Sequence, residues 1–426
     1  MNKLKLSKNL IDTAGKALSR ENETDVDKYI QYMDAFDEYR KNHLEPLSKT
    51  TIEVQQWLSL YGKEYFIAQR IKRKPQIIRK LLRFSIRLSQ LQDIGGARII
   101  VDQNSDVDEV ANFLITRFQS NKELKVIRQT DYRGEGREDS GYRAYHVILE
   151  REGIKMELQI RSKIQHYWAE AIERTSIVYG HYIKELEGDP MVIRYFKTLS
   201  DLFYEIESGR NPDAALRTKV EELRIKSEEI IQSSDEKNVF SSYVNEGVIR
   251  DLEEKEKRMT EPGLNNWIFV FNWNIGSFVT WELITNDPED AIKRYVDFEN
   301  RYTSENGFEV VLVGSSKVTT VRQTHSHYFG LNHTDGQVLE DINSSIVGFS
   351  NTMDIDVGAR EILRTLERRR FWGSKSISVD TLRNHFCKDV LTFDSSFEVL
   401  LDKELVTNHG GVALNLKKKH LINKYV

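Results

Sequence analysis

The feature that most constrains the fold is a strand-like segment with two chemically different faces. Apolar and polar side chains alternate along residues 156–161, which read MELQIR. Because successive side chains of a strand point to opposite faces of the sheet, we expect the Met, Leu and Ile set to pack against helices. The Glu, Gln and Arg set then faces either solvent or a binding site. Solvent is the simpler interpretation for an isolated strand, but the surrounding residues favour a site.

A second carboxylate stands where it can join the first. The segment LQDIGGARIIVD places Asp93 directly before a predicted buried strand, and Gly95 and Gly96 let the backbone turn closely. Carboxylates on neighbouring strands can share one Mg²⁺, which prefers oxygen ligands and usually keeps waters and substrate phosphates. Asp93 and Glu157 are therefore a candidate magnesium site.

The segment from Arg70 to Arg87 is strongly basic, with eight Lys or Arg residues and no acid. We expect a basic helix here that carries Arg70, Lys72, Lys80 and Arg83. Such a density of positive charge suits a polyphosphate, although a nucleic-acid-binding or merely solvated face would look the same. Further along, the segment SGYRAYH supplies an aromatic ring on a glycine loop, which is suited to stacking on a base.

Hydrophobic periodicity predicts an α/β (α+β) protein. Between residues 66 and 185 the elements follow the order α–β–α–β–β–α, which is typical of a mixed β-sheet flanked by helices. The predicted domains are a helical scaffold (1–65), this sheet domain (66–185), a charged helical connector (186–260), a small α/β module (261–335), a linker (336–358) and a C-terminal winged helix (359–426). In the scaffold, helical spacing of apolar residues is also predicted for SKTTIEVQQWLSLYGKEYFIAQRI, residues 48–71.

Composition indicates a cytoplasmic, soluble protein. The 426 residues carry a net charge of −4, with 39% hydrophobic and 30% charged residues. No apolar run approaches the roughly 18 residues that a membrane span needs, and the N-terminus is too polar for a secretory signal. The single cysteine, Cys387, excludes an intrachain disulfide framework and fits a reducing compartment.

Four motifs in order resemble the synthetase domain of the RelA/SpoT family, which has a nucleotidyltransferase-like fold and makes the alarmone (p)ppGpp. They are Arg70-Ile71-Lys72, DIGGARI (93–99), GYRAYH (141–146) and ELQIR (157–161), followed by a helix that begins IQHYWAEAIE. The resemblance extends from Ile67 to Tyr179.

The resemblance implies that ATP donates its β,γ-pyrophosphate to a ribose 3′-hydroxyl. Asp93 and Glu157 would hold Mg²⁺, and Glu157 would also serve as general base. The remaining implied ligands fall into three groups. Arg70 and Arg98 would sandwich adenine; Lys72, Lys80 and Arg83 would hold ATP phosphates; Tyr142 would stack on the acceptor base, with Arg143, His146, Gln159 and Arg161 shaping the acceptor side.

Departures from the family pattern leave the acceptor open. Glu138 and Ser140 stand where a Lys and an Asn are usual, and Gln76 stands where a Ser is usual. The pattern is closer to the toxin-like branch, so the acceptor is a guanosine or adenosine nucleotide, or else the 3′ CCA end of tRNA. A non-catalytic, nucleic-acid-binding regulator is the alternative from another class. No adjacent His-Asp pair is present, and we therefore expect no hydrolase activity.

The C-terminal half carries none of the synthetase motifs and is predicted to bind partners or to regulate the enzyme. DNA binding is the common use of a winged helix, and an interaction or capping role is equally compatible with it. Because an unopposed pyrophosphokinase must be restrained, we expect this half to regulate the enzyme in cis. The alternative is that it only recruits the enzyme to a nucleic acid or a protein. An antitoxin or a trigger protein is a further candidate partner.

Overall fold

The computed structural model describes residues 6–20, 24–137, 140–234, 246–257, 265–272, 274, 277–284, 287–315, 320–321, 324–325, 355, 357–388, 390 and 393–426. Its main elements, in chain order, are α1 (Lys8–Arg20), α2 (Val26–Lys41), α3 (Leu44–Leu58), β1 (Tyr65–Ile71), α4 (Lys74–Phe84), β2 (Gly95–Val101), α5 (Asn104–Ser120), β3 (Lys125–Asp131), β4 (Tyr145–Arg151), β5 (Ile154–Ser162), α6 (Lys163–Tyr179), α7 (Pro190–Glu207), α8 (Ala214–Ser234), α9 (Glu246–Lys257), β6 (Asn265–Asn272), β7 (Ser277–Ile284), α10 (Pro288–Arg301), β8 (Phe308–Ser315), α14 (Val357–Arg368), α15 (Val379–Thr381), α16 (Phe393–Asp402), β9 (Val406–Asn408), β10 (Val412–Leu414) and α17 (Lys419–Tyr425). None of the described helices is long and apolar enough to cross a lipid bilayer.

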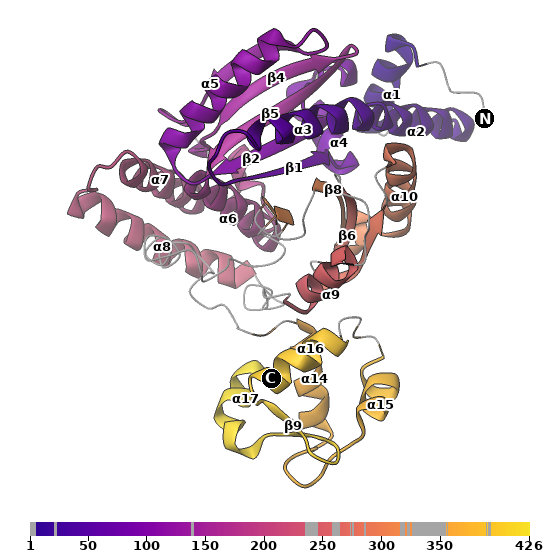
Figure 1. The fold of residues 1–426 in the computed structure, drawn as a ribbon, viewed down its shortest axis with the longest axis vertical. Helices are drawn as coiled ribbons and strands as arrows, with labels where there is room; N and C mark the ends of the chain where they lie inside the picture. The colour runs from indigo at the N-terminus through magenta and orange to yellow at the C-terminus, as the bar shows by residue number, and fades with distance from the viewer. Residues whose placement is uncertain are drawn as a thin grey trace.

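A mixed sheet flanked by helices organises the molecule, as the sequence predicts (Figure 1). Its eight strands lie in the order β3-β4-β5-β2-β1-β8-β6-β7. Strands β2 and β5 run parallel, and the other neighbouring strands pair antiparallel. The parallel pair matters for function because it brings the starts of two strands to the same place.

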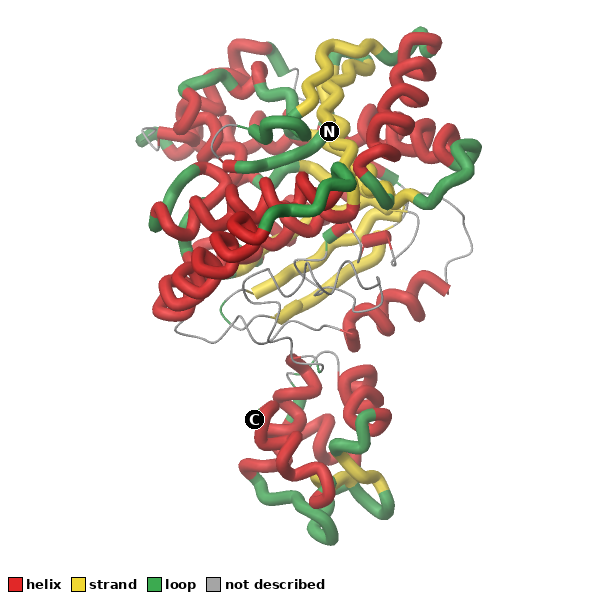
Figure 2. The backbone as a smooth tube through the Cα atoms, turned by 90° about the vertical axis from the view of Figure 1, so that its left-hand side faces the viewer, coloured by secondary structure: helices red, strands yellow, loops and turns green. Residues whose placement is uncertain are grey.

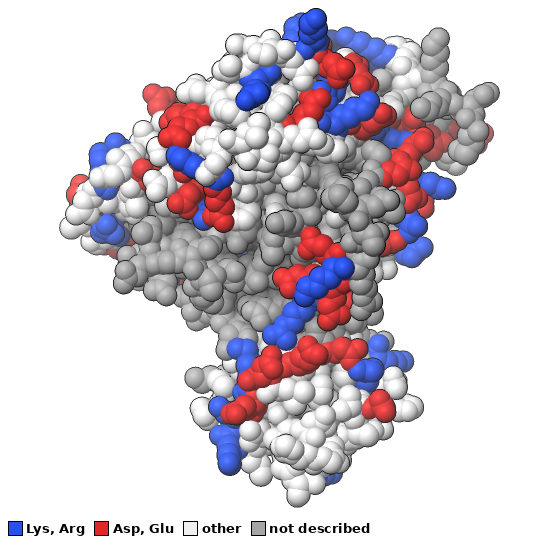
Figure 3. Space-filling model, viewed as in Figure 1, with Lys and Arg blue, Asp and Glu red and all other residues white. Residues whose placement is uncertain are grey.

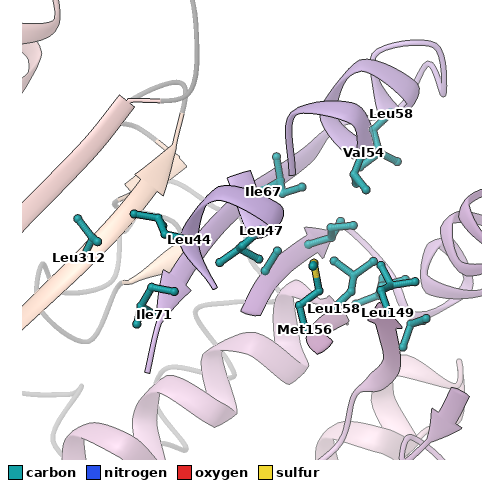
Figure 4. Packing of buried hydrophobic residues seen from close by; sticks show 14 of the residues in the cluster. Leu44, Leu47, Val54, Leu58, Ile67, Ile71, Leu149, Met156, Leu158 and Leu312 are labelled. Atoms are coloured by element: carbon teal, nitrogen blue, oxygen red, sulfur yellow. The ribbon is translucent and has the colours of Figure 1, made fainter. Parts of the chain in front are cut away.

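The apolar face of β5 packs as its alternation predicts. Met156, Leu158 and Ile160 are at most 3% exposed. They join a core that α3, α5 and α10 build over one face of the sheet, and Figure 4 shows Leu47 and Val54 of α3 beside this group. Burying one such side chain stabilises the fold by roughly 1.5–3 kcal/mol. The opposite face of the strand is thereby left for Glu157, Gln159 and Arg161.

Helices α6, α7 and α8 form a second layer with a core of their own. Asp189 caps the start of α7, and Tyr195, Phe196 and Leu199 of that helix are fully buried. The Trp168 indole of α6 donates a hydrogen bond to the Phe196 carbonyl at 2.8 Å. The part of the predicted charged connector that forms α7 is therefore an amphipathic helix, and it packs against α6 of the preceding domain.

Strand β1 replaces part of a predicted helix. The helix α3 ends at Leu58, and residues 65–71 pair with β2 on one side and β8 on the other. Gly62, with φ of +81°, lies in the turn between them and adopts a backbone conformation that favours glycine. The apolar spacing that predicts a helix stops at this turn, and the strand's own mixed burial pattern carries no helical period.

The predicted separate α/β module shares the main sheet. Strands β6, β7 and β8 join it through two residue pairs, Gln69↔Gly314 and Arg70↔Val313. The helix predicted after Asp287 is present as α10, and Asp287 caps it by accepting a hydrogen bond from the Glu289 amide. Local patterns thus predict the elements of this segment, whereas its attachment to β1 is a long-range feature.

The C-terminal module has its own core and lies apart from the sheet (Figure 2). It contains α14, α15, α16, the β9–β10 hairpin and α17, and Ile377 bridges to Val412 beside the hairpin. The predicted Asn-His-Gly-Gly turn lies between the two strands, with positive φ at Gly410 and Gly411. This order is compatible with a winged helix, which stays a prediction. Most of the predicted linker, 336–358, lies outside the described residues.

Helix α16 contacts α9 through a small ionic cluster. Arg250 of α9 lies 3.7 Å from Glu398 and 3.4 Å from Asp402, both on α16. Acidic side chains gather along this edge of the C-terminal module, as Figure 3 shows. The contact places an acidic helix face against the rest of the chain.

Candidate active site

One cavity of about 250 Å³ collects nearly all of the predicted site residues between the sheet and α6. Its lining includes Arg70, Lys72, Lys80, Arg83, Asp93, Arg98, Tyr142, His146, Glu157, Gln159 and Arg161. A smaller space of about 70 Å³ adjoins it and shares several of these residues. Of the predicted residues, Arg143 alone does not line either space.

The parallel pairing of β2 and β5 brings the two carboxylates together. Gly96 lies opposite Glu157 in the register, and Asp93 lies two residues before the start of β2. A side chain at Gly96 would bring its Cβ to 3.2 Å from the Glu157 carbonyl oxygen, which is a tight contact. Glycine at this position therefore permits the close strand pairing that aligns Asp93 with Glu157.

Two lysines neutralise Asp93. Lys72 Nζ and Lys80 Nζ donate hydrogen bonds to Asp93 Oδ2 at 2.6 and 2.7 Å. Burial alone would raise the pKa of the Asp93 carboxyl, but the two ammonium groups outweigh it and hold the pKa below its ordinary value. Lys80 and Arg83 lie on the basic helix α4, whereas Arg70 belongs to β1 and Lys72 to the loop that follows, so the helix predicted to carry all four residues begins later.

The carboxylate pair fits a magnesium ion. Asp93 Oδ1 is buried and has no hydrogen-bond partner among the residues that the structure describes. Within the described ranges, no group of three or more His, Cys, Asp or Glu side chains is arranged to hold a metal. Mg²⁺ needs no such cage, because it commonly takes one or two carboxylates and completes its octahedron with waters and substrate phosphates.

A hydrogen-bonded chain crosses the acceptor side. Tyr142 Oη lies 2.8 Å from His146 Nε2, and His146 Nδ1 lies 2.9 Å from Glu157 Oε1. Arg161 Nη2 donates to Tyr142 Oη at 2.5 Å and to Gln159 Oε1 at 2.6 Å. This chain orients every polar side chain that the alternation of β5 turns towards the cavity.

The charges in this chain support one another. Burial would lower the pKa of His146, but Tyr142 and Glu157 outweigh it and raise the pKa to about 9. Burial would raise the pKa of Tyr142, but Arg161 and His146 lower it to about 8. The pKa of Glu157 is likewise lowered, against its burial, by His146 and by hydrogen bonds. Glu157 is therefore an ionised acceptor of hydrogen bonds at neutral pH.

Arg143 supports the acceptor loop from behind. Its guanidinium donates to Ser200 Oγ at 3.1 Å and to Asp201 Oδ1 at 2.8 Å, both on α7. Gly141, with φ of +76°, packs so closely on α7 that an added Cβ would lie 3.0 Å from Lys197 Cα. The structure thus turns Arg143 away from the cavity, whereas the sequence pattern alone could not distinguish the two directions.

On the side predicted for adenine, Arg98 already has partners. Arg98 Nη1 donates to Glu170 Oε1 at 2.9 Å and to the Thr324 carbonyl at 2.8 Å. Burial, followed by the neighbouring Arg161 cation, lowers the pKa of Arg98 to about 10. His325, next to Thr324, lines the smaller space. A segment more than two hundred residues away in the sequence therefore reaches the predicted donor site.

Several lining residues are absent from the sequence prediction. Arg79 of α4 and Tyr182 stack, with the guanidinium carbon 3.0 Å from the ring centre. Glu170 and Glu173 lie three residues apart on α6, and this helical spacing of acids was the available signal. Of the two acceptor-loop departures, Ser140 lines the cavity, and Glu138 lies outside the described residues.

Comparisons with known proteins agree with the residue pattern. Residues 69–183 match the family model described as a region found in RelA / SpoT proteins. A search among curated proteins found no match.

Solved structures similar to this chain include three bacterial proteins. Small alarmone synthetase 2 from Bacillus subtilis is 22% identical over 40% of this chain and 91% of its own, with a TM-score of 0.34. A GTP pyrophosphokinase family protein from Streptococcus pneumoniae is 21% identical over 47% and 96%, also at 0.34. Small alarmone synthetase 1 from Bacillus subtilis, bound to its product pppGpp, is 22% identical over 44% and 99%, again at 0.34. With the family match covering the strands and loops of the cavity, residues 69–183 of this chain form a domain of the RelA/SpoT family.

Proposed function

We propose that this chain is an ATP-dependent pyrophosphokinase that transfers the β,γ-pyrophosphate of ATP to the 3′-hydroxyl of a purine nucleotide. The product is an alarmone of the (p)ppGpp or (p)ppApp type. The observation that carries the proposal is the pair of Asp93, just before β2, and Glu157, on the neighbouring parallel strand β5, with Lys72 and Lys80 hydrogen-bonded to Asp93. Phosphoryl-type transfer needs mainly positioning and charge neutralisation, and this arrangement supplies both.

The residues divide into a donor side and an acceptor side. Asp93 and Glu157 would hold Mg²⁺, which neutralises charge on the triphosphate. On the donor side, Lys72, Lys80 and Arg83 bind phosphates while Arg70 and Arg98 flank the adenine. Tyr142 stacks on the acceptor base, with His146, Gln159 and Arg161 around it.

In the reaction, the acceptor 3′-oxygen attacks the β-phosphorus of ATP. The bond between the β-phosphorus and the oxygen that bridges to the α-phosphate breaks, and AMP leaves with that oxygen. Glu157, whose carboxylate is ionised and oriented by His146 and Gln159, accepts the proton of the 3′-hydroxyl.

The test is transfer from γ-labelled ATP in the presence of Mg²⁺, with each acceptor supplied separately. Guanosine nucleotides, adenosine nucleotides and tRNA are the three arms. Label on a free purine nucleotide supports the proposal, and the nucleotide that accepts it identifies the alarmone. Label on tRNA alone would replace the proposal with 3′ CCA pyrophosphorylation, a toxin activity. Transfer to none of them would favour a non-catalytic, nucleic-acid-binding regulator.

The proposal extends to the surroundings of the enzyme. It works in the cytoplasm, makes its product without hydrolysing it, and is restrained either in cis or by an antitoxin or trigger protein. The Thr324 carbonyl on Arg98 supports restraint in cis, because adenine would have to displace it. DNA binding through α16 is disfavoured, because that helix presents Glu398 and Asp402 to Arg250 and would present the same acids to phosphates.

A further inference from the structure

The loop that carries Lys72 is held from outside the RelA/SpoT region. This loop, residues 72–73, joins β1 to Lys74, the first residue of α4. Arg73 Nη1 lies 2.5 Å from Glu309 on β8, and Lys74 Nζ lies 2.8 Å from Asp37 on α2. Residues from before and after the matched region 69–183 therefore converge on a loop of the proposed donor site.

The central contact is a fully buried arginine. Arg40, on α2, has 0% of its surface exposed. Its Nε and Nη2 atoms donate to the Lys72 carbonyl at 3.3 and 3.1 Å. Its Nη1 and Nη2 atoms donate to the Glu299 carboxylate of α10 at 2.7 and 3.1 Å, across 259 positions of sequence. The ring of Tyr295, also on α10, lies 5.3 Å from the guanidinium carbon.

Burial makes the orientation of Arg40 depend on Glu299. A guanidinium is costly to bury unless a counter-charge and hydrogen bonds accompany it. Glu299 supplies a two-pronged partner, and the planar fork of arginine then directs its remaining donors at the Lys72 carbonyl. Lys72 Nζ, at the other end of the residue, lies 2.6 Å from Asp93.

We propose that Arg40 and Glu299 are positioning residues that hold Lys72 beside Asp93, so that α10 and β8 complete the binding site for the triphosphate donor. The identity of the donor rests on the proposed function, whereas the placement of Lys72 does not. The backbone supports the same conclusion, because β8 pairs directly with Arg70, the neighbouring donor-side residue. The segment from α10 to β8 is therefore part of the enzyme's working core.

The test compares full-length variants. In the double variant Arg40→Met with Glu299→Met, both buried charges are removed and the side-chain volume is largely kept, a replacement that proteins often tolerate. The control is Glu289→Gln, because Glu289 also joins α10 to α2, through Lys41 at 3.5 Å, but is exposed and does not touch the loop. Arg40→Lys is a second variant, which keeps the charge but cannot serve Glu299 and the Lys72 carbonyl together.

Two measurements report on Lys72. The first is the rate of chemical amine modification of Lys72 relative to Lys80, read by mass spectrometry without nucleotide. The second is the dissociation constant of a non-hydrolysable ATP analogue with Mg²⁺. In the double variant and in Arg40→Lys, we expect Lys72 modification to rise several-fold, and analogue binding to weaken about tenfold, as for other groups that orient a ligand-binding residue. The Glu289→Gln control should match the wild type in both.

Wild-type values of both quantities in a folded double variant would overturn the positioning role, as would equal effects in the Glu289→Gln control. If the double variant does not fold, Arg40→Lys decides by the same criteria. A wild-type protein that does not bind the ATP analogue refutes the proposed function, and the modification rate of Lys72 then still decides the positioning role.

Discussion

Asp93 is the residue on which the proposed chemistry depends most, because it meets both lysines and has one buried oxygen to offer a cation. We predict that Asp93→Asn lowers the transfer rate at least about 100-fold, since the amide cannot supply the charge that a divalent cation requires. The measurement is label transfer from γ-labelled ATP, together with thermal unfolding to show that the fold is retained.

A matched control stands at the other end of the same strand. Asp102 follows β2 and pairs with Lys163 at 3.0 Å, with 56% of its side chain exposed. Asp102→Asn should leave transfer unchanged. Substantial transfer by a folded Asp93→Asn variant would contradict the metal assignment.

Tyr142 allows stacking to be separated from hydrogen bonding. Its hydroxyl joins His146 and Arg161, while its ring lies under the Arg161 guanidinium at 4.9 Å. If the ring binds the acceptor base, Tyr142→Ala should raise the acceptor KM about 5- to 150-fold, the equivalent of roughly 1–3 kcal/mol of stacking. Tyr142→Phe keeps the ring and should raise the acceptor KM much less. The KM for ATP should change little in either variant.

Acceptor KM values that rise equally in Tyr142→Phe and Tyr142→Ala would instead assign the effect to the hydroxyl network. Losses in ATP affinity as large as those in acceptor affinity would place Tyr142 outside the acceptor side altogether.

Single residues also mark where prediction from sequence works. The alternation in β5 predicts that Met156 and Leu158 are buried and that Glu157 faces the cavity, because a strand has a fixed period. The direction of Arg143 follows no such period, since it lies in a loop whose path is set by Ser200 and Asp201 on α7.

At the scale of elements, hydrogen bonds to the carboxyl group of Glu207 link α6 and α7, and the pKa of this group is raised. Glu207, near the end of α7, accepts hydrogen bonds from Ser162, which caps α6, and from Gln165 Nε2 at 3.2 Å. Burial raises the pKa of Glu207 to about 7. The folded chain therefore retains this proton at pH values where the unfolded chain, with a pKa near 4.5, has released it.

The sign of the pH effect follows from linkage. Because the folded state binds more protons between pH 4.5 and 7, the contribution of Glu207 is complete below 4.5 and is lost as the pH rises through 7. We predict that wild-type stability, relative to Glu207→Gln, falls by about 1–3 kcal/mol across this range. Denaturant unfolding at pH 4.5 and 7.5 measures it.

Glu205, two residues earlier, is the matched control. Its side chain is 34% exposed, and a hydrogen bond from Arg210 lowers its pKa, so any stability it adds is lost only as the pH falls below 4.5. In Glu205→Gln, the free energy of unfolding should change between pH 4.5 and 7.5 by the same amount as in the wild type. A wild type and a Glu207→Gln variant that respond equally to pH would show that Glu207 is ionised in the folded protein.

The elements also differ in how far sequence predicts them. Helix α10 carries an Asp cap, a proline in its first turn and helical spacing, all of which are local signals. Strand β1 pairs with β2 nearby and with β8 some 240 residues later, and no local period encodes the second partner. The sheet domain is therefore predictable as a unit, whereas its extension by β6, β7 and β8 is not.

At the scale of the whole molecule, the C-terminal half makes two sets of contacts with the rest of the chain, one from residues before Ser315 and one from residues after it. Before it, Glu299 and Glu309 brace the Lys72 loop and β8 pairs with β1. After it, the Thr324 carbonyl binds Arg98, and α16 of the C-terminal module contacts Arg250. The first set supports the site, and the second belongs to the part of the chain that we propose restrains it, so the place of a truncation decides its effect.

We predict opposite results for two truncations. A chain ending at Lys257 lacks α10 and its Glu299 carboxylate, which leaves Arg40 with only the Asp37 contact at 3.4 Å, and it opens the edge of β1 to aggregation. It should be insoluble or fail to bind a non-hydrolysable ATP analogue.

A chain ending at Ser315 keeps the ion pairs and the strand pairing but frees Arg98 from Thr324. It should stay soluble, bind the analogue more tightly than the full chain and turn over faster. Equal binding and turnover in the soluble 1–315 chain and the full chain would exclude restraint in cis, and a soluble, fully active 1–257 chain would show that the brace is dispensable.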